Sequence, residues 1–164
     1  MITNLLESST FDLDIKQIIM SYINNNYIQY NISLRTNPLG EAQLNQAIDR
    51  LSPIDRDIYV MRQIPKGSVK LPEQGPFLSL GYLSTSIDFN IYLEEPNTFE
   101  RNTYLRIHVP KGRKAIYIPG HETELLFPHN IILTVLGHYK RSVNINEKLY
   151  YLDWYDMYME PLNY

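Results

Sequence analysis

The sequence predicts an α+β protein in which an N-terminal helical pair precedes a mostly antiparallel, sandwich-like β core of two sheets. Three observations support this class. Apolar residues recur at helical spacing in the first third of the chain. The rest contains short β-rich runs bounded by Pro and Gly. A length of 164 residues suits one hydrophobic core, so we expect a single domain over 1–164, helical over 1–53 and β over 54–164.

Two helices are expected in the first third. Thr10 or Asp12 can cap the first helix, whose buried stripe consists of Ile15, Ile18, Ile19, Tyr22 and Ile23. A turn at 37–40 follows. The second helix places Leu44, Ile48 and Leu51 on one face, and it ends at Ser52-Pro53.

The first strand is expected over 57–64, and its alternation puts Ile58, Val60, Arg62 and Ile64 on one face. Arg62 then lies within an apolar face, where an unpaired guanidinium is costly. Two explanations remain open. Arg62 pairs with a structural carboxylate at the strand end, or it forms a socket for phosphate, which guanidinium binds in bidentate fashion.

A second strand is expected over 77–86, and it ends in the hydroxyl residues Ser84, Thr85 and Ser86. Ser84 and Ser86 share a face, while Thr85 points away. Such a cluster either caps a turn, or orients a carboxylate and donates to a bound sugar. The segment 87–102 is expected to be a loop with at most a short helix, long enough to act as a lid, and it carries Phe89, Tyr92 and Phe99.

Further strands are expected over 104–109, 114–118, 122–127 and 130–137, followed by a Tyr-rich segment over 148–159. Glu122 and Glu124 lie two residues apart, so an extended strand would put both carboxylates on one face and turn Leu125 and Phe127 into the core. Taken alone, the pair is typical of a solvated strand edge, and a catalytic pair is the alternative.

Composition narrows the classes of function. The net charge of -3 argues against nucleic acid as the main partner, and the absence of cysteine excludes disulfides and thiolate nucleophiles. The four histidines lack the spacing of zinc proteases, so we expect no metal. Signal-peptide features and an apolar run of roughly 20 residues are missing, so we expect no membrane contact. We expect a monomer in the cytoplasm of its own or of a target cell.

Motifs of other enzyme classes are missing. The sequence contains no Gly-rich phosphate loop of the P-loop or dinucleotide-binding type and no Gly-x-Ser-x-Gly elbow. A glycosidase fits poorly, because its two carboxylates must stand about 5 Å or more apart. Two residues on the same face of one strand span that distance only loosely.

Three features stand in a fixed order: a strand with Arg62, a strand that ends in Ser84-Thr85-Ser86, and a turn that leads into Glu122-x-Glu124. This order resembles the Arg-Ser-Glu class of mono-ADP-ribosyltransferases, which includes bacterial exotoxins. The similarity covers most of the chain, since 30–35 looks like the helical segment before the first motif and 109–118 looks like the strand pair before the Glu-x-Glu turn. The resemblance implies a fold of ADP-ribosyltransferase type and NAD as the substrate.

The resemblance also implies roles on the NAD side of the site. Arg62, with the adjacent Gln63, would hold the phosphate and ribose of NAD. Ser84 would hold the catalytic carboxylate and line the nicotinamide ribose site. Thr85 and Ser86 would support that site and the strand end.

The two glutamates would have different roles. Glu124 would bond the ribose 2′-hydroxyl and stabilise the cation that forms as nicotinamide leaves. Glu122 matches the carboxylate that engages the acceptor guanidinium in arginine-modifying members, so an arginine of a protein target is implied. The target could be actin, a GTPase or ubiquitin.

Two alternatives remain open. An NAD glycohydrolase with water as acceptor would need Arg62, Ser84 and Glu124 but not Glu122. A non-catalytic interaction module that kept the fold would need none of the four. Which of Phe89, Tyr92 and Phe99 packs on nicotinamide is also left open, since each of them can instead belong to the core or to the lid.

Overall fold

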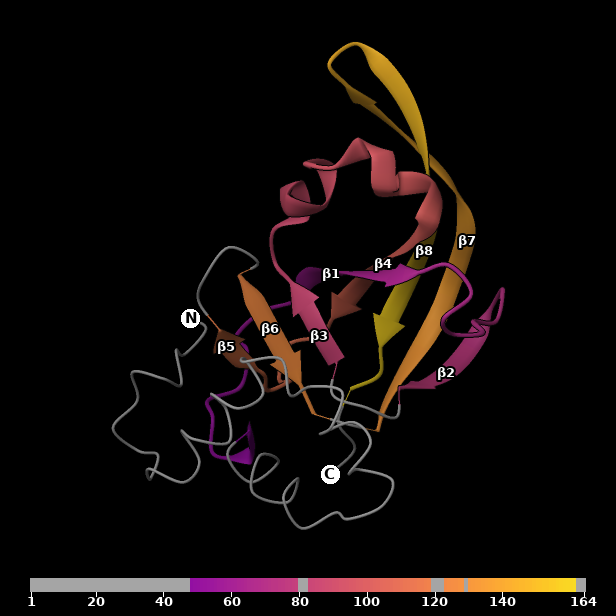
Figure 1. Ribbon diagram of the computed structural model, residues 1–164. Helices are drawn as coiled ribbons and strands as arrows, with labels where there is room; N and C mark the ends of the chain where they lie inside the picture. Colours follow the sequence, from indigo (N-terminus) through magenta and orange to yellow (C-terminus); the bar gives the residue numbers. More distant parts are fainter. Residues whose placement is uncertain (1–47, 80–82, 119–122, 129, 162–164) are drawn as a thin grey trace.

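Eight strands in the described residues form one mixed sheet in the computed structural model of the protein (Figure 1). The structure describes residues 48–79, 83–118, 123–128 and 130–161. The elements in chain order are β1 (Ile58–Pro65), β2 (Gly75–Ser79), β3 (Leu83–Ser86), the 3₁₀ helices η3 (Phe89–Leu93) and η4 (Pro96–Arg101), β4 (Asn102–Val109), β5 (Ile116–Ile118), β6 (Glu124–Phe127), β7 (Ile131–Ile145) and β8 (Lys148–Met159). None of the helices in these residues is long and apolar enough to cross a membrane.

The strand order in the sheet is β2-β7-β8-β4-β1-β3-β6-β5. The pairing of β4 with β8 is parallel, and the other pairings are antiparallel. The prediction of a mostly antiparallel core is therefore confirmed. The described strands are hydrogen-bonded into one sheet, however, and the predicted pair of sheets is not seen.

The predicted helical pair lies largely outside the described residues, because these begin at residue 48. Residues 48–51, at the end of the second predicted helix, are described, and they include two positions of its predicted buried face. Ile48 and Leu51 are both buried, and the Leu51 amide donates to the Ile48 carbonyl at 3.0 Å. Burial of these two positions agrees with the face predicted for them.

The single strand predicted over 77–86 is wrong. β2 pairs with β7 at one edge of the sheet, whereas β3 lies between β1 and β6. One continuous strand cannot serve both sets of partners, because they lie in different parts of the sheet. The hydroxyl residues therefore belong to a short strand of their own, next to β1 and β6.

Two clusters of buried side chains lie on opposite faces of β1. Val60 and Ile64 belong to the main core together with Leu125 and Phe127 of β6. Met61 belongs to a second cluster, which also contains Phe99, Tyr104, Leu152 and Trp154. The faces predicted for β1 and for the apolar side of β6 are therefore confirmed.

β7 and β8 form a long hairpin that projects past the two 3₁₀ helices (Figure 1). The strand predicted over 130–137 continues to Ile145, where Asn146 and Glu147 turn the chain with φ of 51° and 67°. A two-residue turn with both residues left-handed matches the twist of a hairpin, and Asn suits it. The hairpin covers part of the second cluster, because its residues Val143, Ile145 and Tyr150 pack against that cluster.

Candidate active site

Arg62 lies where β1 separates from β3. The two strands meet at a single described pair, Met61 opposite Ser86, and Figure 1 shows the end of β3 next to β1. Arg62 Nη1 donates to the Ser84 carbonyl oxygen at 2.7 Å, so the half-buried guanidinium reaches from β1 to the hydroxyl strand. The neighbouring Gln63 is opposite Tyr104 of β4 and therefore shares the Met61 face of β1.

The three hydroxyl residues of β3 have different surroundings. The Thr85 hydroxyl donates to the Leu125 carbonyl at 2.8 Å and is buried, so it fastens β3 to β6. The buried Ser86 hydroxyl accepts from the Asp88 amide at 3.1 Å, which fixes the chain as it leaves β3. Ser84 is half-buried and opposite Leu126. Thr85 and Ser86 thus hold the backbone in place, whereas Ser84 is partly open to solvent.

Glu124 is the first residue of β6, between two paired strands. It is opposite Ser86 of β3 and Ile118 of β5. Ser84 is its diagonal neighbour on the same face, at a Cα separation of about 7–8 Å that a long side chain can bridge. The side chain is half-buried, and its Oε2 is shielded from solvent. The structure thus brings Arg62, Ser84 and Glu124 onto three adjacent strands.

Thr123, between the two glutamates, is not part of the strand that was predicted over 122–127. β6 begins at Glu124, and Thr123 has a φ of 44°, so the chain turns there instead of running extended. The extended conformation expected for Thr123 is therefore wrong, and the expectation that Glu122 shares a face with Glu124 stays a prediction. Glu122 itself lies outside the described residues.

The segment after β3 forms two 3₁₀ helices rather than one short helix. The Asp88 side chain caps η3 by accepting from the Asn90 amide at 3.0 Å. The Tyr92 hydroxyl donates to the Met61 carbonyl at 3.3 Å, and this bond fastens η3 to β1 beside Arg62. Sequence reasoning missed this contact. The tyrosine was visible as a candidate, but its partner lies 31 residues away.

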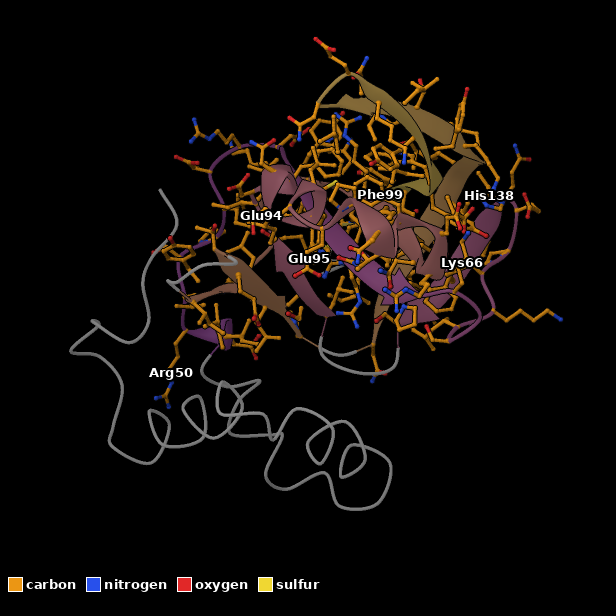
Figure 2. All side chains as sticks on the ribbon, turned by 45° about the horizontal axis from the view of Figure 1, so that its top comes forward. Arg50, Lys66, Glu94, Glu95, Phe99 and His138 are labelled. Carbon is orange, nitrogen blue, oxygen red and sulfur yellow. The ribbon has the colours of Figure 1, made fainter. Side chains whose placement is uncertain are left out.

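The three aromatic residues of this segment pack on the second cluster. Phe99 is 1% exposed and meets Tyr104 edge to face, with ring centroids 6.1 Å apart. Phe89 meets Trp154 in the same manner at 5.4 Å. Figure 2 shows Phe99 between Glu94 and Glu95 on one side and Lys66 and His138 on the other. Phe99 is therefore a core residue in this structure, which is one of the alternatives that the sequence left open.

A histidine with two carboxylate partners lies away from this site. His138 Nδ1 is 2.9 Å from Glu73 and its Nε2 is 2.6 Å from Asp153. The pairing of Arg62 with Leu105, Leu105 with Tyr155 and Tyr155 with His138 puts three strand spacings, about 14 Å, between Arg62 and His138. Within the described residues, no group of His, Cys, Asp or Glu side chains is arranged to hold a metal ion.

The arrangement suits a ligand that has a negatively charged group at one end and develops a positive charge at the other. A guanidinium can bind phosphate, and a carboxylate held at a strand end can stabilise a positive charge that develops on a sugar. Both groups are half-buried, and partial removal from water strengthens such interactions.

Comparison with known proteins identifies the family. The family model described as ADP-ribosyltransferase exoenzyme matches residues 14–152. No curated protein matches the chain. The fold is similar to that of C3larvin toxin, an ADP-ribosyltransferase from Paenibacillus larvae, with a TM-score of 0.71, 20% identity and coverage of 93% of this chain and 90% of the toxin chain.

Two clostridial structures show the same fold. An ADP-ribosyltransferase from Clostridium botulinum has a TM-score of 0.66 and 13% identity, over 94% of this chain and 90% of that chain. The enzymatic component C2-I of the C2-toxin from Clostridium botulinum has a TM-score of 0.71 and 15% identity, over 93% of this chain but 45% of that longer chain. ADP-ribosyltransferases use NAD as their substrate. The chain therefore belongs to the ADP-ribosyltransferase exoenzyme family, a group of toxin-type mono-ADP-ribosyltransferases.

Proposed function

We propose that this enzyme transfers ADP-ribose from NAD to an arginine of a protein target and releases nicotinamide. The observation that carries the proposal is the hydrogen bond from Arg62 to the Ser84 carbonyl of β3. Ser86, the last residue of the same strand, is opposite Glu124. Arg62, Ser84 and Glu124 thus lie on the neighbouring strands β1, β3 and β6, and this supports the roles that the sequence resemblance implies for them.

In the proposed reaction, Arg62 and Gln63 bind the phosphate and ribose of NAD, and Ser84 lines the nicotinamide ribose with support from Thr85 and Ser86. Glu124 accepts a hydrogen bond from the ribose 2′-hydroxyl and stabilises the oxocarbenium-like cation. A fixed negative charge acts there on the transition state more than on the ground state.

The bond changes are those of a substitution at the ribose anomeric carbon. The bond from that carbon to the nicotinamide nitrogen breaks, and the electron pair leaves with nicotinamide. A guanidinium nitrogen of the acceptor arginine forms the new bond and loses a proton, which we assign to the carboxylate of Glu122. Water in place of arginine would give free ADP-ribose.

The experiment combines the purified protein with NAD labelled in its adenylate half and a cell lysate. We expect label on a protein band and, with agmatine as a small guanidine acceptor, labelled ADP-ribosylagmatine. Glu124→Gln should abolish both products and also the release of nicotinamide.

Glu122→Gln separates transfer from hydrolysis. It should reduce labelling of protein and agmatine and leave the cleavage of NAD by water close to that of the wild type. Free ADP-ribose as the only product of the wild-type enzyme would refute transfer. Equal loss of both activities in Glu122→Gln would refute the role given to Glu122.

A further inference from the structure

Thr123 is a strained residue directly before Glu124. Its φ of 44° lies in the left-handed region, where a β-branched side chain crowds the backbone. Glycine adopts this conformation without steric cost. Strained backbone tends to cluster at functional sites, and an observed outlier there justifies a functional hypothesis.

The peptide plane between Thr123 and Glu124 is held in place by β3. The Thr123 carbonyl belongs to that plane and accepts from the Ile87 amide at 3.3 Å, and Ile87 directly follows Ser86. Glu124 is paired with Ser86 on one side and with Ile118 on the other. This plane fixes the N and Cα atoms of Glu124, and together with the two strand pairings it sets the direction of the Cα–Cβ bond that carries the carboxylate, whose Oε2 is shielded from solvent.

We propose that Thr123 is a positioning residue that aims the Glu124 carboxylate at the ribose of NAD, a role that rests on the proposed function of Glu124. The branched side chain leaves few left-handed backbone conformations open, so the turn has little freedom of movement. Thr123 therefore lowers the stability of the fold and at the same time restricts the motion of Glu124. A glycine at this position reverses both effects.

The test is Thr123→Gly, and the two expected effects have opposite signs. Loss of strain should raise the midpoint of thermal unfolding by roughly 3–6 °C. The kcat for nicotinamide release should fall roughly tenfold, because a less restricted carboxylate is misplaced more often. The KM for NAD should change by less than about twofold, since Thr123 acts through Glu124 and not on substrate binding.

Two further variants isolate the effect. Thr123→Asn should keep kcat within about threefold of the wild type, because Asn accepts a left-handed backbone and still carries a side chain that limits the turn. Glu147→Gly is the matched control, since Glu147 is also left-handed, with φ of 67°, in the β7–β8 turn. It should raise the unfolding midpoint and leave kcat unchanged.

Amide hydrogen exchange gives a readout that needs no activity. Protection of the Ile87 amide should fall about tenfold in Thr123→Gly and stay unchanged in Glu147→Gly. A higher unfolding midpoint with unchanged kcat and unchanged Ile87 protection would overturn the proposal. Failure of the proposed function has a different signature, namely a wild-type enzyme that releases no nicotinamide. Exchange at Ile87 would then still decide whether Thr123 restricts the turn.

Discussion

At the scale of single residues, Arg62 carries the NAD side of the proposed site. Lysine there would keep the charge but lose the planar fork that binds phosphate with two hydrogen bonds. Lysine also cannot readily reproduce the bond that Arg62 makes to the Ser84 carbonyl. We expect Arg62→Lys to raise the KM for NAD roughly tenfold, equivalent to about 1.4 kcal/mol of binding free energy, in steady-state assays of nicotinamide release.

Arg106 provides the matched control for that substitution. It is opposite Met61 on β4, and its guanidinium stands 3.9 Å from the Tyr59 ring centroid, so it leans along β1 toward Tyr59 and away from Arg62 and Gln63. Arg106→Lys should leave the KM for NAD unchanged. A similar rise in both variants would mean that the effect comes from general loss of arginine packing and would contradict the NAD role of Arg62.

The sequence predicts the surroundings of some site residues and not of others. Alternation alone places Arg62 among Val60 and Ile64, because a strand has a period of two. Its contact with the Ser84 carbonyl depends on how β1 and β3 meet in the fold. The two residues are 22 positions apart, so no local sequence pattern predicts the contact. The assumption of an extended residue failed at Thr123, since β-branched residues rarely adopt a positive φ and threonine itself favours strands.

At the scale of elements, the segment of η3 and η4 is fastened to the sheet by aromatic packing. Phe99 meets Tyr150 of the β7–β8 hairpin edge to face at 5.2 Å, besides its contact with Tyr104 of β4. The Tyr92 bond to Met61 holds the other end of the segment. The segment therefore connects the hairpin to the strand that carries Arg62.

This connection predicts that the segment unfolds together with the sheet. Phe99→Leu should lower the free energy of unfolding by about 1–2 kcal/mol, because it removes ring contacts at a site that is 1% exposed. Urea denaturation gives the measurement. Tyr151→Leu, at a 57% exposed position of the same hairpin, should change this free energy by less than about 0.5 kcal/mol. Equal small changes in both variants would show that the segment is not part of the cooperative core.

The aromatic content of this segment was visible in the sequence, but its packing partners were not. Asp88 and Pro96 are local signals, and they do begin the two 3₁₀ helices. Trp154 and Tyr150 both come from β8, more than 50 residues later, so the contacts with Phe89 and Phe99 required the tertiary fold. The division of 77–86 into β2 and β3 could not be predicted for the same reason. The two strands are distinguished by their partners, which are β7 for β2 and β6 for β3.

At the scale of the whole molecule, His138 connects four parts of the chain. Its two ring nitrogens meet Glu73, before β2, and Asp153 of β8. Asp153 in turn accepts from the Thr103 hydroxyl of β4 at 2.6 Å. Each ring nitrogen needs a proton to donate to its carboxylate, so the geometry favours the charged imidazolium.

The pKa of His138 follows from this geometry. Burial alone would lower that pKa, but hydrogen bonds with Asp153 and Glu73 outweigh burial and raise it above the ordinary value of 6.5. Burial also tends to raise the pKa of Asp153, while hydrogen bonds from Thr103 and His138 bring it below 3.8. Between pH 3.8 and pH 6.5 the folded protein therefore holds a charged His138 imidazolium next to an ionised Asp153 carboxylate.

The stability of the fold should accordingly fall on the alkaline side. The folded state holds the His138 proton more tightly than the unfolded state does, so the stabilisation is complete below pH 6.5 and is lost as the pH rises through the higher folded pKa. We expect the free energy of unfolding, measured in urea, to decrease from pH 6 to pH 9 in the wild type and to decrease less in His138→Gln. Glu73→Gln should give an intermediate slope, because one of the two carboxylates remains. Asn144→Ala, an uncharged exposed position on the same strand, should shift the curve without changing its slope. Parallel curves for the wild type and His138→Gln would contradict this coupling, because the hydrogen bonds from the charged imidazolium to Glu73 and Asp153 have to weaken when its proton leaves.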